Sequence, residues 1–485
     1  MNMIFILKLK KMNKLKLGFL IIIFTLSYFN LSAHKRAKYN IVIDSDGKLE
    51  DFRTISLFTA SLDFNINCIT SVEGKMPANK TANLLKNLLK IYHHEGILIG
   101  EGNEKTKVTK HDNHILEFLY KLFGKSEESF ENAIDILGKA IENERKRTII
   151  IALGPLTNIA KMLDKYPDNI IKTEMILWYS DYENLSKDFN YSTNKKAYEE
   201  ILKMQIPIKF VSSNKKFYSQ DFPTFIKEIN SNYAKIFKSL LDFQKIEQNE
   251  ISKELTSLYL LYPSIFDETK VGEFAINLKL KENSEPEILI SSILNSDKPQ
   301  ASVIFNEIPT SGYMIMKDIE KYSEDLISKH GYNEFKITAL CSEIHSHIGI
   351  YNILGAKLGL RIMEYLHAGL DEIQIVSYAG YQPPISCFND GLQVGTGSTI
   401  GYGTISVDTT KEVQPALMVI YNNRKILFKI KPEIVEMAAN DIAELVKKHG
   451  LESEMYWNVL REISIEKYWL NISRYDLAEI EELKE

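Results

Sequence analysis

The sequence predicts an α/β protein: an open, mostly parallel sheet in a larger first domain, followed by a smaller α+β domain. Short apolar segments alternate with segments of helical periodicity from residue 39 onward, which is typical of parallel α/β folds. The chain has 485 residues, enough for two or three domains. A composition shift near residue 332 precedes a new apolar segment, so we expect domains over 34–332 and 333–485.

The alternation can be followed along the first domain. Each predicted strand is a short, continuous apolar run, and each predicted helix repeats its apolar residues with helical spacing. Strands are predicted over 40–44, 66–72, 96–100 and 147–153, and helices over 53–62, 80–92 and 156–166. The polar stretch 281–299 is expected to be a surface excursion of this domain, and 318–330 a polar helix.

The second domain begins with apolar residues and ends in charged ones. An apolar helix is predicted over 351–365, and the residues after Lys431 are expected to form a helical C-terminal extension. No period of 20–50 residues repeats, so a solenoid is excluded.

The N-terminus is predicted to be a signal peptide, residues 1–33. Five lysines and no acidic residue precede the apolar run 17–29, and Ser32-Ala33 follows it. The run is short for a membrane-spanning helix, which needs about 20 residues. We therefore expect an exported protein, periplasmic or extracellular, with an uncleaved anchor as the alternative.

Charge and cysteine content exclude several classes of protein. Removal of residues 1–33 takes away five lysines and no acid, which lowers the net charge from −5 to −10. An acidic protein with scattered lysines is a poor nucleic-acid binder, so we expect no nucleic-acid partner. Three cysteines and no Cys-x-x-Cys pair exclude a disulfide framework and a zinc ribbon.

An acidic cluster follows the first predicted strand. Asp44, Asp46, Glu50 and Asp51 lie within eight residues, at the strand end where parallel α/β folds bind ligands. Clustered carboxylates repel one another unless a cation offsets them, and Ca²⁺ or Mg²⁺ prefers such oxygen ligands. The alternative is a solvated acidic turn that caps the next helix.

The cluster resembles the Asp-x-Asp-x-Gly-x-Asp-Asp signature of the inosine/uridine-preferring nucleoside hydrolases. Further segments resemble that family in the same order, so the resemblance covers about residues 39–330. They are Val72-Glu73-Gly74-Lys75 with Lys80-Thr81, the Leu-Gly-Pro-Leu-Thr-Asn segment 153–158, the Asp-Phe-Asn segment 188–190, and 254–266 with Tyr262-Pro263.

The resemblance implies a reaction and a role for each matched residue. Nucleoside hydrolases cleave the N-glycosidic bond of ribonucleosides through an oxocarbenium-like transition state, using a Ca²⁺-bound water, and release base and ribose. By similarity, Asp46 is the general base. The implied calcium ligands are Asp46, Glu50, Asp51, the backbone carbonyl near Leu153, and Glu254. The implied substrate-binding residues are Lys75, Asn184, Asp188 and Asn190.

Several matched positions depart from the family pattern. Glu50 and Glu254 stand where the family has aspartates, and Asp188 stands where it has a glutamate. Lys75 replaces an asparagine, and Lys253 stands where many members carry a histidine. Carboxylate charge is kept while geometry changes, which is consistent with an enzyme of altered substrate or with a ribose-binding protein that has lost turnover.

A second set of polar residues lies in the last third. His345, His347 and Cys387 could hold Zn²⁺. The stretch 336–430 resembles the domain that forms the E component of formylmethanofuran dehydrogenase, on these three residues together with Asp390 and Gln393. Two of that domain's three motif cysteines are absent here, so redox chemistry is not expected. The alternative is a substrate-free structural domain that docks on the first domain, for example as a dimer contact.

Three hypotheses follow from the sequence. The first is an exported calcium-dependent nucleoside hydrolase that acts on a small-molecule nucleoside or related riboside. The second is a non-catalytic ribose- or nucleoside-binding protein. The third is an enzyme whose metal-dependent site lies in the C-terminal domain. After removal of the leader we expect no stable membrane span. The sequence leaves open whether the protein forms a homo-oligomer.

Overall fold

The computed structural model describes residues 37–103, 113–144, 146–212, 216–243, 249–295, 307–370 and 372–483. The predicted signal peptide lies outside the described residues. Within the described ranges, no helix is both long and apolar enough to cross a membrane.

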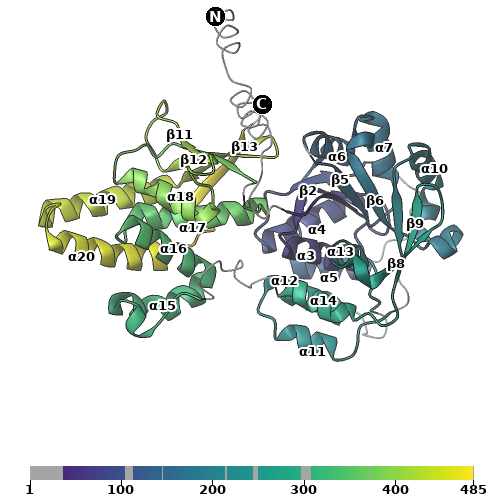
Figure 1. The fold of residues 1–485 in the computed structure, drawn as a ribbon, viewed down its shortest axis with the longest axis horizontal. Coiled ribbons are helices and arrows are strands. Elements are labelled where there is room, and N and C mark those ends of the chain that lie inside the picture. The colour runs from purple at the N-terminus through teal and green to yellow at the C-terminus, as the bar shows by residue number, and fades with distance from the viewer. Residues whose placement is uncertain are drawn as a thin grey trace, which may run out of the picture. The chain divides into compact units, whose positions relative to one another are not determined.

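The first domain is built on a nine-stranded sheet with the strand order β4-β3-β2-β1-β5-β6-β7-β9-β8 (Figure 1). Every neighbouring pair is parallel except β8–β9, which is antiparallel. The strands are β1 (Tyr39–Ser45), β2 (Phe64–Ser71), β3 (Leu98–Glu101), β4 (Glu131–Asn132), β5 (Thr148–Ala152), β6 (Thr173–Tyr179), β7 (Ile208–Val211), β8 (Phe266–Lys270) and β9 (Ala275–Leu280). The predicted open, mostly parallel sheet is confirmed.

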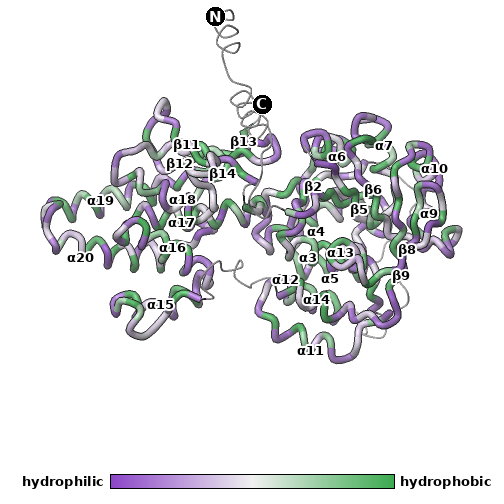
Figure 2. Tube along the Cα trace, in the orientation of Figure 1, coloured by the Kyte–Doolittle hydropathy of each residue, from purple (hydrophilic) through white to green (hydrophobic). Residues whose placement is uncertain are grey.

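Successive residues of the central strands face opposite sides of this sheet and feed two cores. Ile41 and Ile43 of β1 pack in one core, while Val42 packs in the other. Figure 2 shows these central strands largely green, as expected for strands buried on both faces. Helices on the first core are α3 (Leu49–Ala60), α4 (Ala78–Ile91), α5 (Asn113–Phe123), α11 (Phe222–Lys227), α12 (Asn232–Asp242), α13 (Leu255–Leu261) and α14 (Pro286–Leu294). Helices on the second are α6 (Ala133–Glu142), α7 (Thr157–Lys165), α8 (Asn169–Lys172), α9 (Phe189–Thr193) and α10 (Lys195–Lys203).

The predicted elements of the first half agree with the structure to within a few residues. One prediction for this domain is wrong: 281–299 is not simply a surface excursion. Residues 286–294 form α14, whose Ile290 and Leu294 are fully buried in the first core. The polar residues that flank this helix concealed its short apolar face.

The second domain has a five-stranded mixed sheet with the order β11-β10-β12-β13-β14, parallel only between β10 and β11. Its strands are β10 (Gln374–Ser377), β11 (Ile405–Val407), β12 (Ala416–Tyr421), β13 (Arg424–Ile430) and β14 (Ala478–Leu483). Its helices are α15 (Lys317–His330), α16 (Tyr332–His345), α17 (Ile350–Leu366), α18 (Phe388–Thr396), α19 (Pro432–His449) and α20 (Glu454–Ile463), with a π-helix, η6, over Ser464–Leu470. The predicted α+β class of this smaller domain is confirmed.

Two details refine the predicted organisation. The tail after Lys431 is helical as expected up to η6, but it ends in β14, which pairs with β13. Helix α15 packs in the second core through Ile319 and Leu326. The domain boundary near 332 stays a prediction.

Candidate functional site

The acidic cluster lies on the turn between β1 and α3. Gly47 has a φ of +78°, and a Cβ on it would come within 2.3 Å of the Thr81 hydroxyl, so the turn requires glycine here. Asp51, in the first turn of α3, accepts hydrogen bonds through Oδ2 from the backbone N–H groups of Asp46 (3.0 Å) and Gly47 (3.1 Å). The carboxylate of Asp51 therefore fixes the turn that presents Asp46.

Lys253 lies between the two central carboxylates. Its Nζ is 2.7 Å from Asp46 Oδ1 and also donates to Asp51 Oδ1. The side chains of all three residues are at most 1% exposed. The structure thus brings the predicted base Asp46 together with Asp51, but the cation between them is an ammonium group of the chain itself.

The pKa values of Asp46 and Asp51, which share the Lys253 ammonium, shift in opposite directions. Burial favours the protonated form of Asp46, but the Lys253 and Lys48 ammoniums hold its pKa below the usual value. Burial and the charge of Asp46 raise the pKa of Asp51. Burial opposes the charge of Lys253, yet Asp46 and Asp51 raise its pKa. The two carboxylates therefore favour the charged form of Lys253.

Glu254, the predicted fourth carboxylate ligand, pairs with a different cation. Its Oε1 is 2.5 Å from Arg53 Nε, and its Oε2 accepts the backbone N–H of Ser252 at 2.9 Å. Arg53 is fully buried and also donates to Asn249 Oδ1 at 3.3 Å. Sequence reasoning missed Arg53. The sequence signal that could have identified it is the glutamate at position 254, whose extra methylene lets the carboxylate reach the guanidinium.

The backbone carbonyl of Leu153 also has a protein partner. Asn190, a predicted sugar ligand, donates Nδ2 to Leu153 O at 3.1 Å and to Tyr179 O at 2.8 Å. Asn190 Oδ1 is buried without a hydrogen-bond partner among the described residues. The amide nitrogen therefore bonds the ends of two segments that follow or close the strands, and the amide oxygen stays buried and unpaired in the described structure.

The residues present do not fit the calcium ion that the resemblance implies. Ca²⁺ takes six to eight oxygen ligands at about 2.3–2.6 Å. Of the predicted ligands, Asp46 and Asp51 hold Lys253, Leu153 O holds Asn190, and Glu254 holds Arg53. The remaining one, Glu50, also faces cations of the chain: burial opposes its charge, but the charges of Arg53 and Lys48 lower its pKa. In the described part of the chain, no three His, Cys, Asp or Glu side chains form a group that could hold a metal ion.

The other predicted substrate residues are spread around the cluster. Lys75 is exposed; its backbone N–H lies 3.4 Å from Asp46 Oδ2, and its Nζ lies 3.7 Å from the centre of the Phe189 ring. Asn184 is exposed and donates to Asp181 Oδ2 at 2.8 Å. Asp188 caps α9 by accepting the N–H of Tyr191 at 3.0 Å. Lys75 thus borders the site, whereas Asn184 and Asp188 are engaged elsewhere.

Asp44, near the end of β1, is buried and bonded to two neighbouring segments. Its Oδ1 accepts hydrogen bonds from Thr70 Oγ1 at 2.6 Å and Asn158 Nδ2 at 3.0 Å. Its Oδ2 is buried without a partner in the described structure, and burial raises its pKa to about 7. The first strand therefore carries, next to its last residue, a buried carboxylate whose protonated form is favoured by burial.

The second domain contains a cavity of about 550 Å³ that gathers most of its predicted residues. His345, Cys387, Asp390 and Gln393 all line it. His345 Nδ1 lies 2.7 Å from Asp390 Oδ2, and His345 Nε2 is buried with no partner among the described side chains. The Asp390 carboxylate bonded to Nδ1, and the nearby Cys387 thiol, raise the pKa of His345 to about 9.

The predicted zinc set is only partly assembled. His347 is not among the residues that line the cavity; its ring packs on His345, with centroids 4.3 Å apart, and on Trp457 at 5.1 Å. The bond from His345 Nδ1 to a carboxylate is typical of zinc-binding histidines, because it orients Nε2 toward the metal. His345 and Cys387 thus suit a soft metal, while His347 would have to turn.

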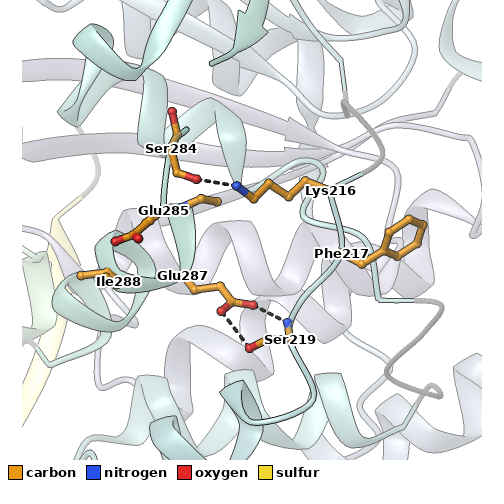
Figure 3. Close-up of a pocket in the computed structure, with 8 residues that line it drawn as sticks. Lys216, Phe217, Ser219, Ser284, Glu285, Glu287 and Ile288 are labelled. Atoms are coloured by element: carbon orange, nitrogen blue, oxygen red, sulfur yellow. Dashed lines mark hydrogen bonds between the residues drawn. The ribbon is translucent and has the colours of Figure 1, made fainter. Parts of the chain in front are cut away.

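A second cavity, of about 380 Å³, lies between residues 216–219 and the start of α14 (Figure 3). Its polar groups pair with one another: Lys216 Nζ donates to Ser284 O, and Ser219 Oγ donates to Glu287 Oε2 at 2.9 Å. None of the predicted site residues lines it.

Two family models match the chain. The model described as inosine-uridine preferring nucleoside hydrolase matches residues 41–333, more than half of the chain. The model described as FmdE, molybdenum formylmethanofuran dehydrogenase operon, matches residues 344–468. Both resemblances seen in the sequence are confirmed.

Individual relatives are distant. An uncharacterised protein of Schizosaccharomyces pombe is 27% identical over 182 residues, covering 35% of this chain and 59% of that protein. The pyrimidine-specific ribonucleoside hydrolase RihA of Salmonella paratyphi C is 24% identical over 296 residues, covering 54% and 92%. The solved inosine-uridine preferring nucleoside hydrolase of Bacillus anthracis is 12% identical, with a TM-score of 0.46, covering 53% of this chain and 99% of that one.

Proposed function

Because the chain belongs to the inosine-uridine preferring nucleoside hydrolase family, we propose that its first domain hydrolyses the N-glycosidic bond of a ribonucleoside or related N-riboside. The observation that carries the proposal is the position of Asp46. This carboxylate follows β1, at the edge where parallel α/β sheets bind ligands, and it is held by a turn that Asp51 fixes.

In the proposed reaction, water adds to the anomeric carbon of the ribosyl group while the bond to the base nitrogen breaks. Asp46 takes the proton of the attacking water, and the base leaves with the bonding electron pair and takes up a proton from the solvent. Carboxylates around the sugar stabilise the positive charge that develops on its ring. The calcium dependence that the resemblance implies is not part of this proposal, because the residues present do not fit the ion.

Two observations favour a second candidate for the same domain, riboside binding without turnover. Asp46 is fully buried and bonded to Lys253, which weakens it as a base. Asn190 Oδ1 is a buried acceptor without a partner in the described residues, and a sugar hydroxyl would satisfy it.

The cavity of the second domain supports a further proposal. If the His347 ring turned toward the cavity, His345, His347 and Cys387 would together hold a Zn²⁺, which would supply Lewis-acid chemistry there. His345 would be held in orientation by Asp390. Export of the chain to the periplasm or the extracellular space is likewise proposed, from the basic and apolar leader.

The test is free-ribose release from a panel of purine and pyrimidine nucleosides by residues 34–485. Asp46→Asn is the informative variant, and Asp164→Asn, an exposed acid on α7, is the matched control. Release that Asp46→Asn abolishes and Asp164→Asn keeps supports hydrolysis. Nucleoside-dependent thermal stabilisation without release supports binding. Ribose release that persists in the Asp46→Asn variant would show that the activity lies at another site.

A further inference from the structure

We propose that the Lys253 ammonium is a built-in replacement for a divalent cation, so that the carboxylate site of the first domain forms without calcium. This inference deepens the proposed function, but its readout is cation binding, which does not need turnover. It rests on three features of the site: where Lys253 Nζ lies, how closely the chain packs around Asp46, and which cations the predicted carboxylate ligands hold.

Lys253 Nζ lies where a shared cation between Asp46 and Asp51 would have to lie. It is bonded to one oxygen of each carboxylate, at 2.7 Å from Asp46 Oδ1. All three side chains are excluded from solvent. An ammonium and a calcium ion cannot share this position, because two cations a few ångströms apart in a buried site repel strongly.

The space around Asp46 is also closely packed. A Cβ on Gly74 would come within 2.6 Å of Asp46 Cβ, and a Cβ on Gly154 within 2.8 Å of it. Glycine at both positions lets the backbone approach the carboxylate from two strand ends. Calcium with its waters would need room that the chain and the Lys253 side chain now fill.

Buried cations of the chain itself pair with the predicted carboxylate ligands. The chain supplies two buried monocations, Lys253 and Arg53. Lys253 pairs with both Asp46 and Asp51, and Arg53 pairs with Glu254. Lys253 and Glu254 are adjacent in sequence. One short segment therefore provides both the cation that pairs with Asp46 and Asp51 and the carboxylate that pairs with Arg53.

The test is calcium titration of the full chain by calorimetry, together with thermal unfolding in CaCl₂ and in EDTA. We expect no binding heat at this site and the same melting temperature in both solutions. Stoichiometric calcium binding that is lost in Asp46→Asn, or a melting temperature that falls by several degrees in EDTA, would overturn the inference.

A gain-of-binding variant makes the test sharper. Lys253→Ala vacates the position between two carboxylates, and we expect it to bind Ca²⁺ with a dissociation constant of about 0.1–1 mM and to gain a few degrees of melting temperature in CaCl₂. Lys357→Ala removes another fully buried lysine, paired with Glu334 in the second domain, and should show neither effect. Equal calcium responses of the two variants would contradict the proposal. If Lys253→Ala does not fold, the wild-type titration still decides it.

Discussion

Lys253 and Asp46 are 207 positions apart in the chain, yet Nζ of one lies 2.7 Å from Oδ1 of the other. The contact joins the segment before α13 to the turn after β1, at the carboxyl end of the central strands. The turn that carries Asp46 therefore depends on a cation that the chain itself supplies.

Replacement of Lys253 by methionine should destabilise the chain by about 3–5 kcal/mol at pH 7, because two buried carboxylates lose their shared cation. The loss should shrink toward pH 4, where those carboxylates take up protons. Urea unfolding across this pH range measures both effects. Lys253→Arg keeps a cation and is the control; an equal loss in that variant would assign the effect to packing rather than to charge.

The Arg53–Glu254 pair should show strong coupling. Arg53→Met leaves Glu254 buried without its guanidinium, with an expected loss of about 3–5 kcal/mol, and Glu254→Gln leaves Arg53 in the same state. In the double variant both charges are gone, so the losses should not add. A double-mutant cycle of unfolding free energies checks this, and additive losses would show that the pair is not energetically coupled.

Asp44 should make stability fall as pH rises from about 4 to about 7. Burial raises its folded pKa from 3.8 to about 7, so in this window the folded state binds a proton that the unfolded state has released. The stabilisation is complete below pH 4 and is lost as pH approaches 7, by at most about 4 kcal/mol. Asp44→Asn should flatten this part of the pH profile in denaturant titrations. A profile as steep as that of the wild type would refute the assignment.

Cys387 should be the first thiol to react with a cysteine reagent under native conditions. It is half-buried at the cavity of the second domain, whereas Cys68 and Cys341 are fully buried. If His345 and Cys387 bind Zn²⁺, then one equivalent of zinc should slow this labelling at least tenfold, and His345→Ala should remove the protection. Unchanged labelling with zinc would exclude the proposed ligand pair.

The fold could be predicted because its signals are local. The apolar runs of β1, β2 and β5 and the periodicity of α4 and α7 each specify one element without long-range information. Helix α14 and strand β14 were missed, since a short apolar face between polar flanks and a charged edge strand carry little local signal. The last strand, over Ala478–Leu483, is mostly glutamate on its exposed side.

The site was predictable in part. The sequence placed Asp46 and Asp51 together, because both flank one turn. It identified Lys253 and Glu254 as departures, but it could not show that their side chains would turn to different partners. The path of a long lysine side chain depends on contacts more than 200 positions away, and so does the burial of Arg53 against Glu254.

The most direct measurement is a crystal structure of the full chain grown in 10 mM CaCl₂. The account predicts Lys253 Nζ within hydrogen-bonding distance of both Asp46 and Asp51, with no calcium ion between them. A calcium ion bound by Asp46 and Asp51, with Lys253 displaced from both, would contradict it.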